Sequence, residues 1–215
     1  MKCRIAFFVF LLILGASMGA SAASIVGNGS FETPSLPAST AVGDPTGAGV
    51  DWTFSGEGAG IESNGGVYAF TAAPDGVQVA YMQFANSISQ TVNLTPGDDY
   101  TLTYYLEQRS SYSAWLPIVV SVGGSTVDDI TSSPGTTAWI LYTDAFTAGS
   151  SSELLAFTGS DPTGADEAAG LDDATITLVG GSPTSAVPEP GTIALLGSGL
   201  LGLAGMVRRK FGKNA

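Results

Sequence analysis

Carboxylates are the only abundant side chains in this sequence that could carry out acid–base or metal-binding chemistry. The 215 residues include 19 Asp and Glu, no His and a single Cys, Cys3. Without His the chain has no Ser-His-Asp triad, no Cys-His pair, no imidazole-ligated zinc and no imidazole general base. Two kinds of chemistry stay open: paired carboxylates that act on glycosidic bonds, and hard cations bound through oxygen.

A second group of side chains has the types that bind sugars. It follows a predicted strand in which alternate residues form a core face, and the opposite face carries an aromatic ring, an acid and then an arginine. Such a ring stacks on the C–H face of a sugar while the charged groups bind its hydroxyls. The candidate carbohydrate-binding residues are Tyr105, Glu107, Arg109, Tyr112 and Trp115. Alternatively, Arg109 forms a structural ion pair with Glu107 or with a carboxylate on a neighbouring strand.

The charges are distributed unevenly along the chain. Residues 24–186 contain 18 acidic residues and one base, Arg109, a formal charge of −17, while the other bases lie at the two ends. Binding of nucleic acid requires Lys and Arg to neutralise phosphates, so a nucleic-acid partner is excluded. Most of these acids are expected to keep the protein soluble, and some could bind a hard cation.

The elements that must position these side chains are predicted to be strands. Between the two ends no segment keeps a helical apolar period, whereas many alternate between clusters of Gly, Pro, Asp and Ser. The predicted strands are Val77–Phe84, Ile88–Leu94, Tyr100–Gln108, Leu116–Val122, Thr137–Phe146, Glu153–Thr158 and Ala174–Val179. Short strands at this spacing predict an all-β fold, a jelly-roll sandwich, over residues 23–179. Trp52 and Trp139 are expected in its core.

The N-terminus has the features of a secretory signal peptide over residues 1–22. Lys2 and Arg4 precede an apolar run, which ends in the small residues Ala20-Ser21-Ala22. Cleavage before Ala23 would remove Cys3, so the exported protein is expected to fold without disulfides. Passage through the Sec translocon is the expected route.

The C-terminus has the features of a membrane stop. A linker at residues 180–187 leads to Pro188, Glu189 and Pro190, followed by a predicted short transmembrane helix at residues 192–207 and then a basic tail that begins with Arg208 and Arg209. A helix of this length reaches about 24 Å, slightly less than the hydrocarbon core of a bilayer. Residues 188–215 resemble the PEP-CTERM sorting signal of Gram-negative bacteria. This resemblance implies recognition by an exosortase after a transient inner-membrane stage, followed by release or attachment at the cell surface. The alternative is a plain C-terminal anchor that stays in the membrane.

Three stretches of the body together resemble the galactose-binding-domain-like jelly rolls found among carbohydrate-binding modules. They are Asn28-Gly29-Ser30-Phe31-Glu32, the segment from Ile88 to Leu102, and Leu171-Asp172-Asp173-Ala174-Thr175-Ile176. The resemblance implies that the first and last stretches lie side by side and that a structural Ca²⁺ is bound there by Glu32, Asp172 and Asp173. Adjacent residues of a regular strand point to opposite faces, so both Asp side chains could reach one ion only if the chain bends between them. The alternative is that Asp172-Asp173 is a solvated start of a strand.

These features favour a non-catalytic, exosortase-processed protein of the cell surface or extracellular matrix. Its expected ligand is a polysaccharide such as the exopolysaccharide of the producing cell. A secreted glycosidase that uses paired carboxylates is the second interpretation, and a purely structural component of a biofilm is the third.

Overall fold

The body of the protein is built from short β-strands. The computed structural model describes residues 24–109, 115–131, 138–160 and 166–179. The strands are β1 (Ala41–Gly43), β2 (Thr53–Phe54), β3 (Ala59–Ser63), β4 (Gln78–Gln83), β5 (Ser87–Asn93), β6 (Asp99–Gln108), β7 (Ile118–Val122), β8 (Ser125–Ile130), β9 (Ile140–Thr147), β10 (Ser152–Gly159) and β11 (Ala168–Leu178). No helix in the described part of the chain is long and apolar enough to cross a membrane.

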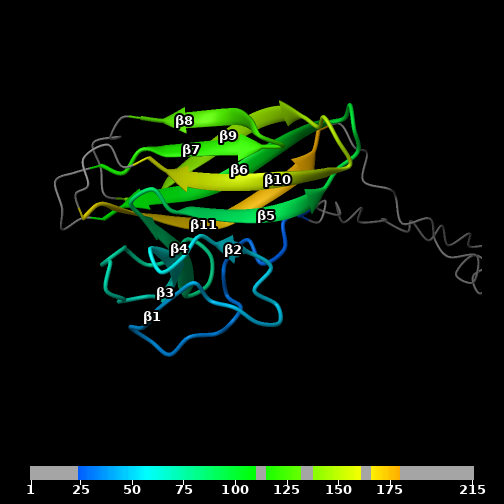
Figure 1. Ribbon diagram of the computed structural model, residues 1–215. Coiled ribbons are helices and arrows are strands. Elements are labelled where there is room, and N and C mark those ends of the chain that lie inside the picture. The colour runs from blue at the N-terminus through cyan, green and yellow to red at the C-terminus, as the bar shows by residue number, and fades with distance from the viewer. Residues whose placement is uncertain (1–23, 110–114, 132–137, 161–165, 180–215) are drawn as a thin grey trace, which may run out of the picture. The chain divides into compact units, whose positions relative to one another are not determined.

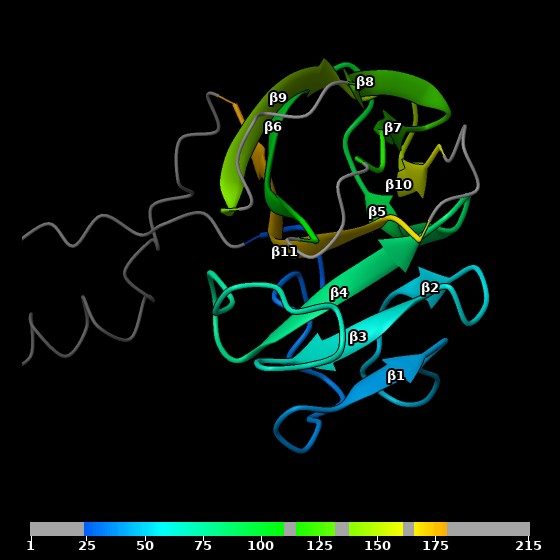
Figure 2. The same ribbon diagram turned by 90° about the vertical axis from the view of Figure 1, so that its left-hand side faces the viewer.

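The strands form two antiparallel sheets. One sheet has the order β1-β3-β4-β11-β6-β9, and the other has the order β2-β5-β10-β7-β8. Figure 1 shows β7, β8, β10 and β5 in front of β6, β9 and β11, and Figure 2 shows the same two layers from the side. The predicted all-β sandwich is therefore confirmed.

The main core lies between the two sheets. As alternation predicts, Tyr100, Leu102, Tyr104 and Leu106 of β6 all point inward and are at most 3% exposed. Trp52 is also buried, as expected, with its ring 6.3 Å from that of Phe157. The burial of these large side chains is the main contribution to the stability of the sandwich.

A second hydrophobic cluster covers part of the outer face of the six-stranded sheet. It contains Phe70, Val79, Tyr81 and Ala168, with Tyr68, Ala73, Ala41 and Trp139 packed against it. The chain between β3 and β4, here called the 64–77 connection, supplies Tyr68, Phe70 and Ala73. Gly170 allows the rings to approach β11, since a Cβ there would lie 2.8 Å from Trp139 and 3.2 Å from Phe70. Trp139 therefore belongs to this cluster and not to the main core.

The first and last segments of the body lie side by side, as the resemblance implies. The N–H of Ile25 donates to the carbonyl of Ile176 at 3.1 Å, and the N–H of Ala174 donates to the carbonyl of Gly29 at 3.0 Å. The register of β11 against β6 shifts between Asp172 and Thr175, where Asp173 has a φ of 46°. This is a β-bulge, so the chain bends at the Asp-Asp pair.

Alternation alone failed to predict some of the strands. The strands missed are β1, β2, β3 and β8, together with the first half of β11. All five residues of β3 are buried because the 64–77 connection covers its outer side, so β3 shows no alternation. β8 carries Asp128 and Asp129, and such acids are poor strand signals.

Two Leu-to-Ala substitutions in the same sheet should test which face forms the core. Leu102 is fully buried, and Leu102→Ala should lower the free energy of unfolding by about 2–5 kcal/mol because it leaves a cavity. Leu141 on the neighbouring strand is 52% exposed, and Leu141→Ala should change it by no more than about 0.5 kcal/mol. Urea titration measures both values, and equal losses would contradict the assigned faces.

Candidate functional site

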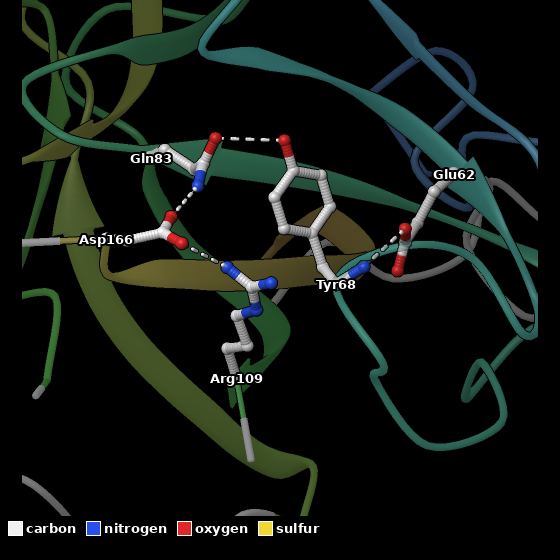
Figure 3. Close-up of polar contacts among 5 residues, drawn as sticks. All are labelled: Glu62, Tyr68, Gln83, Arg109 and Asp166. Atoms are coloured by element: carbon white, nitrogen blue, oxygen red, sulfur yellow. Dashed lines mark hydrogen bonds and ion pairs between the residues drawn. The ribbon is translucent and has the colours of Figure 1, made fainter. Parts of the chain in front are cut away.

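Four polar side chains form a closed network at one end of the six-stranded sheet (Figure 3). The hydroxyl of Tyr68 donates to Oε1 of Gln83 at 2.9 Å, and Nε2 of Gln83 donates to Oδ1 of Asp166 at 2.7 Å. Nη1 of Arg109 donates to Oδ2 of Asp166 at 3.1 Å. The guanidinium group then lies 5.3 Å from the centre of the Tyr68 ring, which closes the circle through a cation–π contact.

The pairing of β11 with two neighbours brings these residues together. β11 lies between β4 and β6, and its first residue, Ala168, is paired with Gln83 of β4. The N–H of Arg109, just after β6, donates to the carbonyl of Ala168 at 3.0 Å. Asp166 lies two residues before β11, and its carboxylate bridges Gln83 at the end of β4 and Arg109 just after β6. Tyr68 reaches the same point from the 64–77 connection.

The network forms the polar edge of the second hydrophobic cluster. The ring of Tyr68 lies 4.3 Å from that of Tyr81, and burial raises the pKa of both phenols, so they act as neutral donors and acceptors. The Arg109 side chain is 14% exposed and that of Asp166 is 46% exposed. Water or a hydroxylated ligand can therefore reach the carboxylate, while the arginine is largely held by the protein.

Two buried carboxylates accept hydrogen bonds from the 64–77 connection, which carries Tyr68 of the network. Glu62 is 2% exposed and accepts the N–H of Tyr68 at 3.1 Å. Glu107 is 1% exposed and accepts both the N–H and the hydroxyl of Thr71. Loss of solvent raises the pKa of both carboxyl groups, and the N–H donors oppose that rise.

The predicted sugar-binding residues are only partly brought together. Glu107 was expected on an exposed face, and this expectation is wrong because the 64–77 connection covers it. Tyr105 is partly exposed and lies between Leu141 and Asp172 of the neighbouring strands. Trp115 packs against the main core, and its indole N–H donates to the carbonyl of Ile130 at 3.3 Å. Tyr112 lies outside the described residues. Arg109 forms an ion pair, as the structural alternative proposed, with Asp166 as its partner.

Sequence reasoning missed Tyr68, Gln83, Asp166 and Glu62. Tyr68 belongs to the irregular 64–77 connection, and the other three lie at or beyond the ends of strands. The one signal available was Arg109, since a lone base in an acidic body must lie near some carboxylate. Which carboxylate it meets depends on strand order, which alternation does not reveal.

The three residues predicted to bind calcium all lie near the end of the 64–77 connection. Oε1 of Glu32 accepts the N–H groups of Val77 and Gln78 at 2.8 and 2.7 Å. Asp172 is fully buried and accepts the N–H of Asp75 at 2.9 Å. Asp173 follows on the bulge and is partly buried.

This arrangement fits a calcium ion only in part. Among the described residues, no three Asp, Glu, Cys or His side chains lie close enough together to hold a metal ion. Backbone carbonyls would have to supply most of the six to eight oxygens that calcium requires. Burial, opposed by the N–H groups of Asp75 and Asp173, raises the pKa of Asp172 to about 8. Calcium binding therefore stays a prediction.

The sequence of the body identifies its family. Residues 24–170 match a family described as "Protein of unknown function (DUF642)". The chain belongs to the DUF642 family. Residues 186–210 match the PEP-CTERM protein-sorting motif, which confirms the signal predicted from Pro188, Glu189, Pro190, Arg208 and Arg209. These five residues lie outside the described residues, and no curated protein matches the DUF642 chain.

Solved structures with a similar fold include a cyclase and a carbohydrate-binding module. A cyclase from Fischerella sp. TAU, in complex with 4-(1H-indol-3-yl)butan-2-one, is 20% identical with a TM-score of 0.56, and the match covers 73% of this chain and 98% of the cyclase. TmCBM61 in complex with beta-1,4-galactotriose is 15% identical with a TM-score of 0.50, and the match covers 73% and 99%. At these identities the DUF642 body shares a fold with both proteins, and the expected carbohydrate-binding-module type of sandwich is confirmed.

Replacing Glu107 with Gln should remove a pH-dependent part of the stability. Because the folded state has the raised pKa, it binds more protons than the unfolded state above the ordinary carboxyl pKa. The stability that Glu107 contributes is therefore full below that ordinary pKa and falls as pH rises through the raised value. Gln does not titrate, so the free energy of unfolding of wild type, relative to that of Glu107→Gln, should increase as pH falls through the raised pKa toward the ordinary carboxyl pKa.

Urea titrations at several pH values measure this difference. Glu57→Gln removes an exposed carboxylate and serves as the control for the loss of one charge. If the difference in unfolding free energy between wild type and Glu107→Gln were constant with pH, Glu107 would have the same pKa in the folded and unfolded states.

Calcium should raise the melting temperature of the protein if Glu32 and Asp172 bind it. An ion at about 100 times its Kd adds about 2.7 kcal/mol to stability, which corresponds to several degrees. EDTA should reverse the gain, and Glu32→Gln should abolish it, while Glu57→Gln should keep it. An unchanged melting temperature in calcium and EDTA would remove the predicted site.

Proposed function

We propose that this protein is an exported, non-catalytic surface protein whose sandwich binds polysaccharide through the network of Tyr68, Gln83, Arg109 and Asp166. The observation that carries the proposal is the partly exposed ion pair of Arg109 and Asp166 at the edge of an aromatic cluster. A fold shared with carbohydrate-binding modules supports it by analogy only.

The network offers the chemistry that sugar hydroxyls require. A hydroxyl is both a donor and an acceptor, and here the Asp166 carboxylate and the Gln83 and Arg109 side chains place acceptors and donors side by side. Two apolar residues adjacent in sequence to the network, Val67 and Phe84, are 64% and 40% exposed. In this proposal the C–H face of a sugar ring packs against one of these two side chains.

The charge of the body limits the kind of polysaccharide. Residues 24–186 carry a formal charge of −17, and their one base, Arg109, already faces Asp166. A polymer rich in carboxylate or sulfate groups would be repelled. The ligand class is therefore a neutral polysaccharide or a neutral stretch of the producer's exopolysaccharide.

The sorting motif supports the proposed location. A PEP-CTERM motif implies processing by an exosortase and export to the cell envelope or surface. In this proposal the signal peptide directs the chain to the Sec translocon, residues 192–207 hold it briefly in the inner membrane, and processing yields the surface or extracellular form. A biofilm matrix is where such a protein would meet its ligand.

The glycosidase alternative needs two carboxylates facing a substrate. Asp128 and Asp144 interact with each other near the hydroxyl of Tyr104, and burial raises the pKa of Asp144. The Tyr104 hydroxyl donates to Asp128 at 3.0 Å, and its ring is fully buried in the main core. In this proposal the pair holds the Tyr104 hydroxyl at the edge of the core and has no catalytic role.

Replacing Asp166 should weaken polysaccharide binding without unfolding the protein. Asp166→Ala in the full-length chain, purified in mild detergent, should raise the Kd for the host's neutral polysaccharide about tenfold or more, because a charge-assisted hydrogen bond is lost. Asp129→Ala removes an exposed acid on β8 and should leave the Kd unchanged. Circular dichroism checks that both variants are folded.

Three results would contradict the proposed function. Wild-type protein that binds none of the host's polysaccharides would favour the structural interpretation. Release of reducing sugar would favour the glycosidase. Equal affinities of wild type and Asp166→Ala would exclude the network as the binding site.

A further inference from the structure

A pocket of about 300 Å³, lined by none of the four network residues, lies on β2 and on the connection between β1 and β2. Its lining consists of Asp44, Pro45, Thr46, Gly47, Val50, Asp51, Trp52, Thr53 and Phe54. This connection lies on the side of the body away from β8 (Figures 1 and 2). The pocket is at the small end of the range for ligand sites and has room for about one sugar residue.

The floor and the rim of the pocket differ in chemistry. Val50, Trp52 and Phe54 form an apolar floor and are about 5% exposed or less. The exposed residues Asp44, Asp51, Thr46 and Thr53 bring carboxylates and hydroxyls to the lining. None of the lining residues is basic, so the pocket carries two negative charges and no compensating positive charge of its own.

The wall that carries Asp51 is held in place by buried hydrogen bonds. Nε2 of Gln90, a residue that is 8% exposed, donates to the carbonyl of Asp51 at 3.1 Å. Nδ2 of Asn28 donates to the carbonyl of Val50 at 3.2 Å, and the indole N–H of Trp52 donates to the carbonyl of Asn28 at 2.9 Å. These bonds hold Asp51 at a φ of 58°, in the left-handed region. The backbone that carries Asp51 is thus fixed before a ligand arrives, which lowers the entropic cost of ordering this wall on binding.

We infer that this pocket binds a sugar residue with a free ammonium group, such as a deacetylated amino sugar. An ammonium group has three donors, which match two carboxylates and a threonine hydroxyl. The apolar floor contacts the C–H face of the ring. A divalent metal ion fits less well, because calcium needs six to eight oxygens and this pocket supplies two carboxylates around an apolar floor.

The ligand class rests on the proposed carbohydrate-binding function, but the site and the charge of its ligand differ from those of the network. The network takes neutral sugar, whereas the pocket selects a positive charge. An N-acetyl group removes that charge and adds bulk, so the pocket should bind an acetylated sugar more weakly than the free amino sugar. The two sites share no residue, and each can be tested by a variant that leaves the other intact.

The test compares β-1,4-linked glucosamine tetramer with its fully N-acetylated counterpart. Both are titrated into the full-length chain in mild detergent at about pH 6, where the amines are largely protonated. Binding is measured by calorimetry and by tryptophan fluorescence, to which Trp52 contributes. The glucosamine tetramer should bind about tenfold or more tightly than the acetylated tetramer, and this preference should weaken with salt. Asp44→Asn and Asp51→Asn should each reduce the preference about tenfold.

Matched variants separate this site from the rest of the body. Asp129→Asn removes an exposed acid on β8 that does not line the pocket, and the preference should survive in it. An equal loss in Asp129→Asn would show that overall charge causes the binding. Equal affinity for the two tetramers, or saturation of the pocket by Ca²⁺ with displacement of the glucosamine tetramer, would overturn the inference.

The Asp166→Ala variant distinguishes this inference from the proposed function. This variant should bind neutral polysaccharide more weakly than wild type and should bind the glucosamine tetramer with unchanged affinity. If wild type binds the tetramer through Asp44 and Asp51 but binds no neutral polysaccharide, the network proposal fails and the pocket stands. If Asp166→Ala loses the tetramer as well, the pocket is not its site.

Discussion

Four carboxylates that accept backbone N–H groups, three of them buried, fix how the 64–77 connection lies on the six-stranded sheet. Four acids from different parts of the chain each hold one point along this connection or at the start of β4. The pairs are Glu62 with Tyr68, Glu107 with Thr71, Asp172 with Asp75, and Glu32 with Val77 and Gln78. A body with one base cannot neutralise its buried acids with cations, so peptide donors take that place. Glu32, Glu107 and Asp172, which were singled out from the sequence as candidate site residues, thus also hold the connection in place.

The second hydrophobic cluster and the polar network depend on this constraint. The 64–77 connection carries Tyr68 and Phe70 onto the outer face of the sheet, where Gly170 leaves room for Phe70 and Trp139. Tyr68 can then lie under the guanidinium group of Arg109 and donate to Gln83. The pairing of β11 with both β4 and β6 supplies the other side of the network. Packing and hydrogen bonding therefore position the site together.

Alternation predicted the elements that have one covered and one open face. The inward residues of β6 were assigned correctly because each alternates with a less buried neighbour. Alternation failed to predict the burial of Glu107 and of all of β3, because the 64–77 connection covers the outer face of the sheet at these positions. Arg109 was recognisable as a lone base, but its partner Asp166 lies 57 residues away along the chain, and only strand order brings the two together. The pocket at Asp44 and Asp51 has no regular pattern and requires the folded connection.

The two ends of β11 lie at different functional parts of the body. Asp166 precedes this strand, and the described chain leaves the body at Val179, just beyond its other end. Eleven residues of strand span roughly 35 Å, and the opening segment at Ile25 runs beside the same far end. If the body is tethered beyond Val179, that tether and the Arg109–Asp166 pair are at opposite ends of the longest strand. Within the body, the length of β11 therefore separates the Arg109–Asp166 pair from the point where the described chain ends.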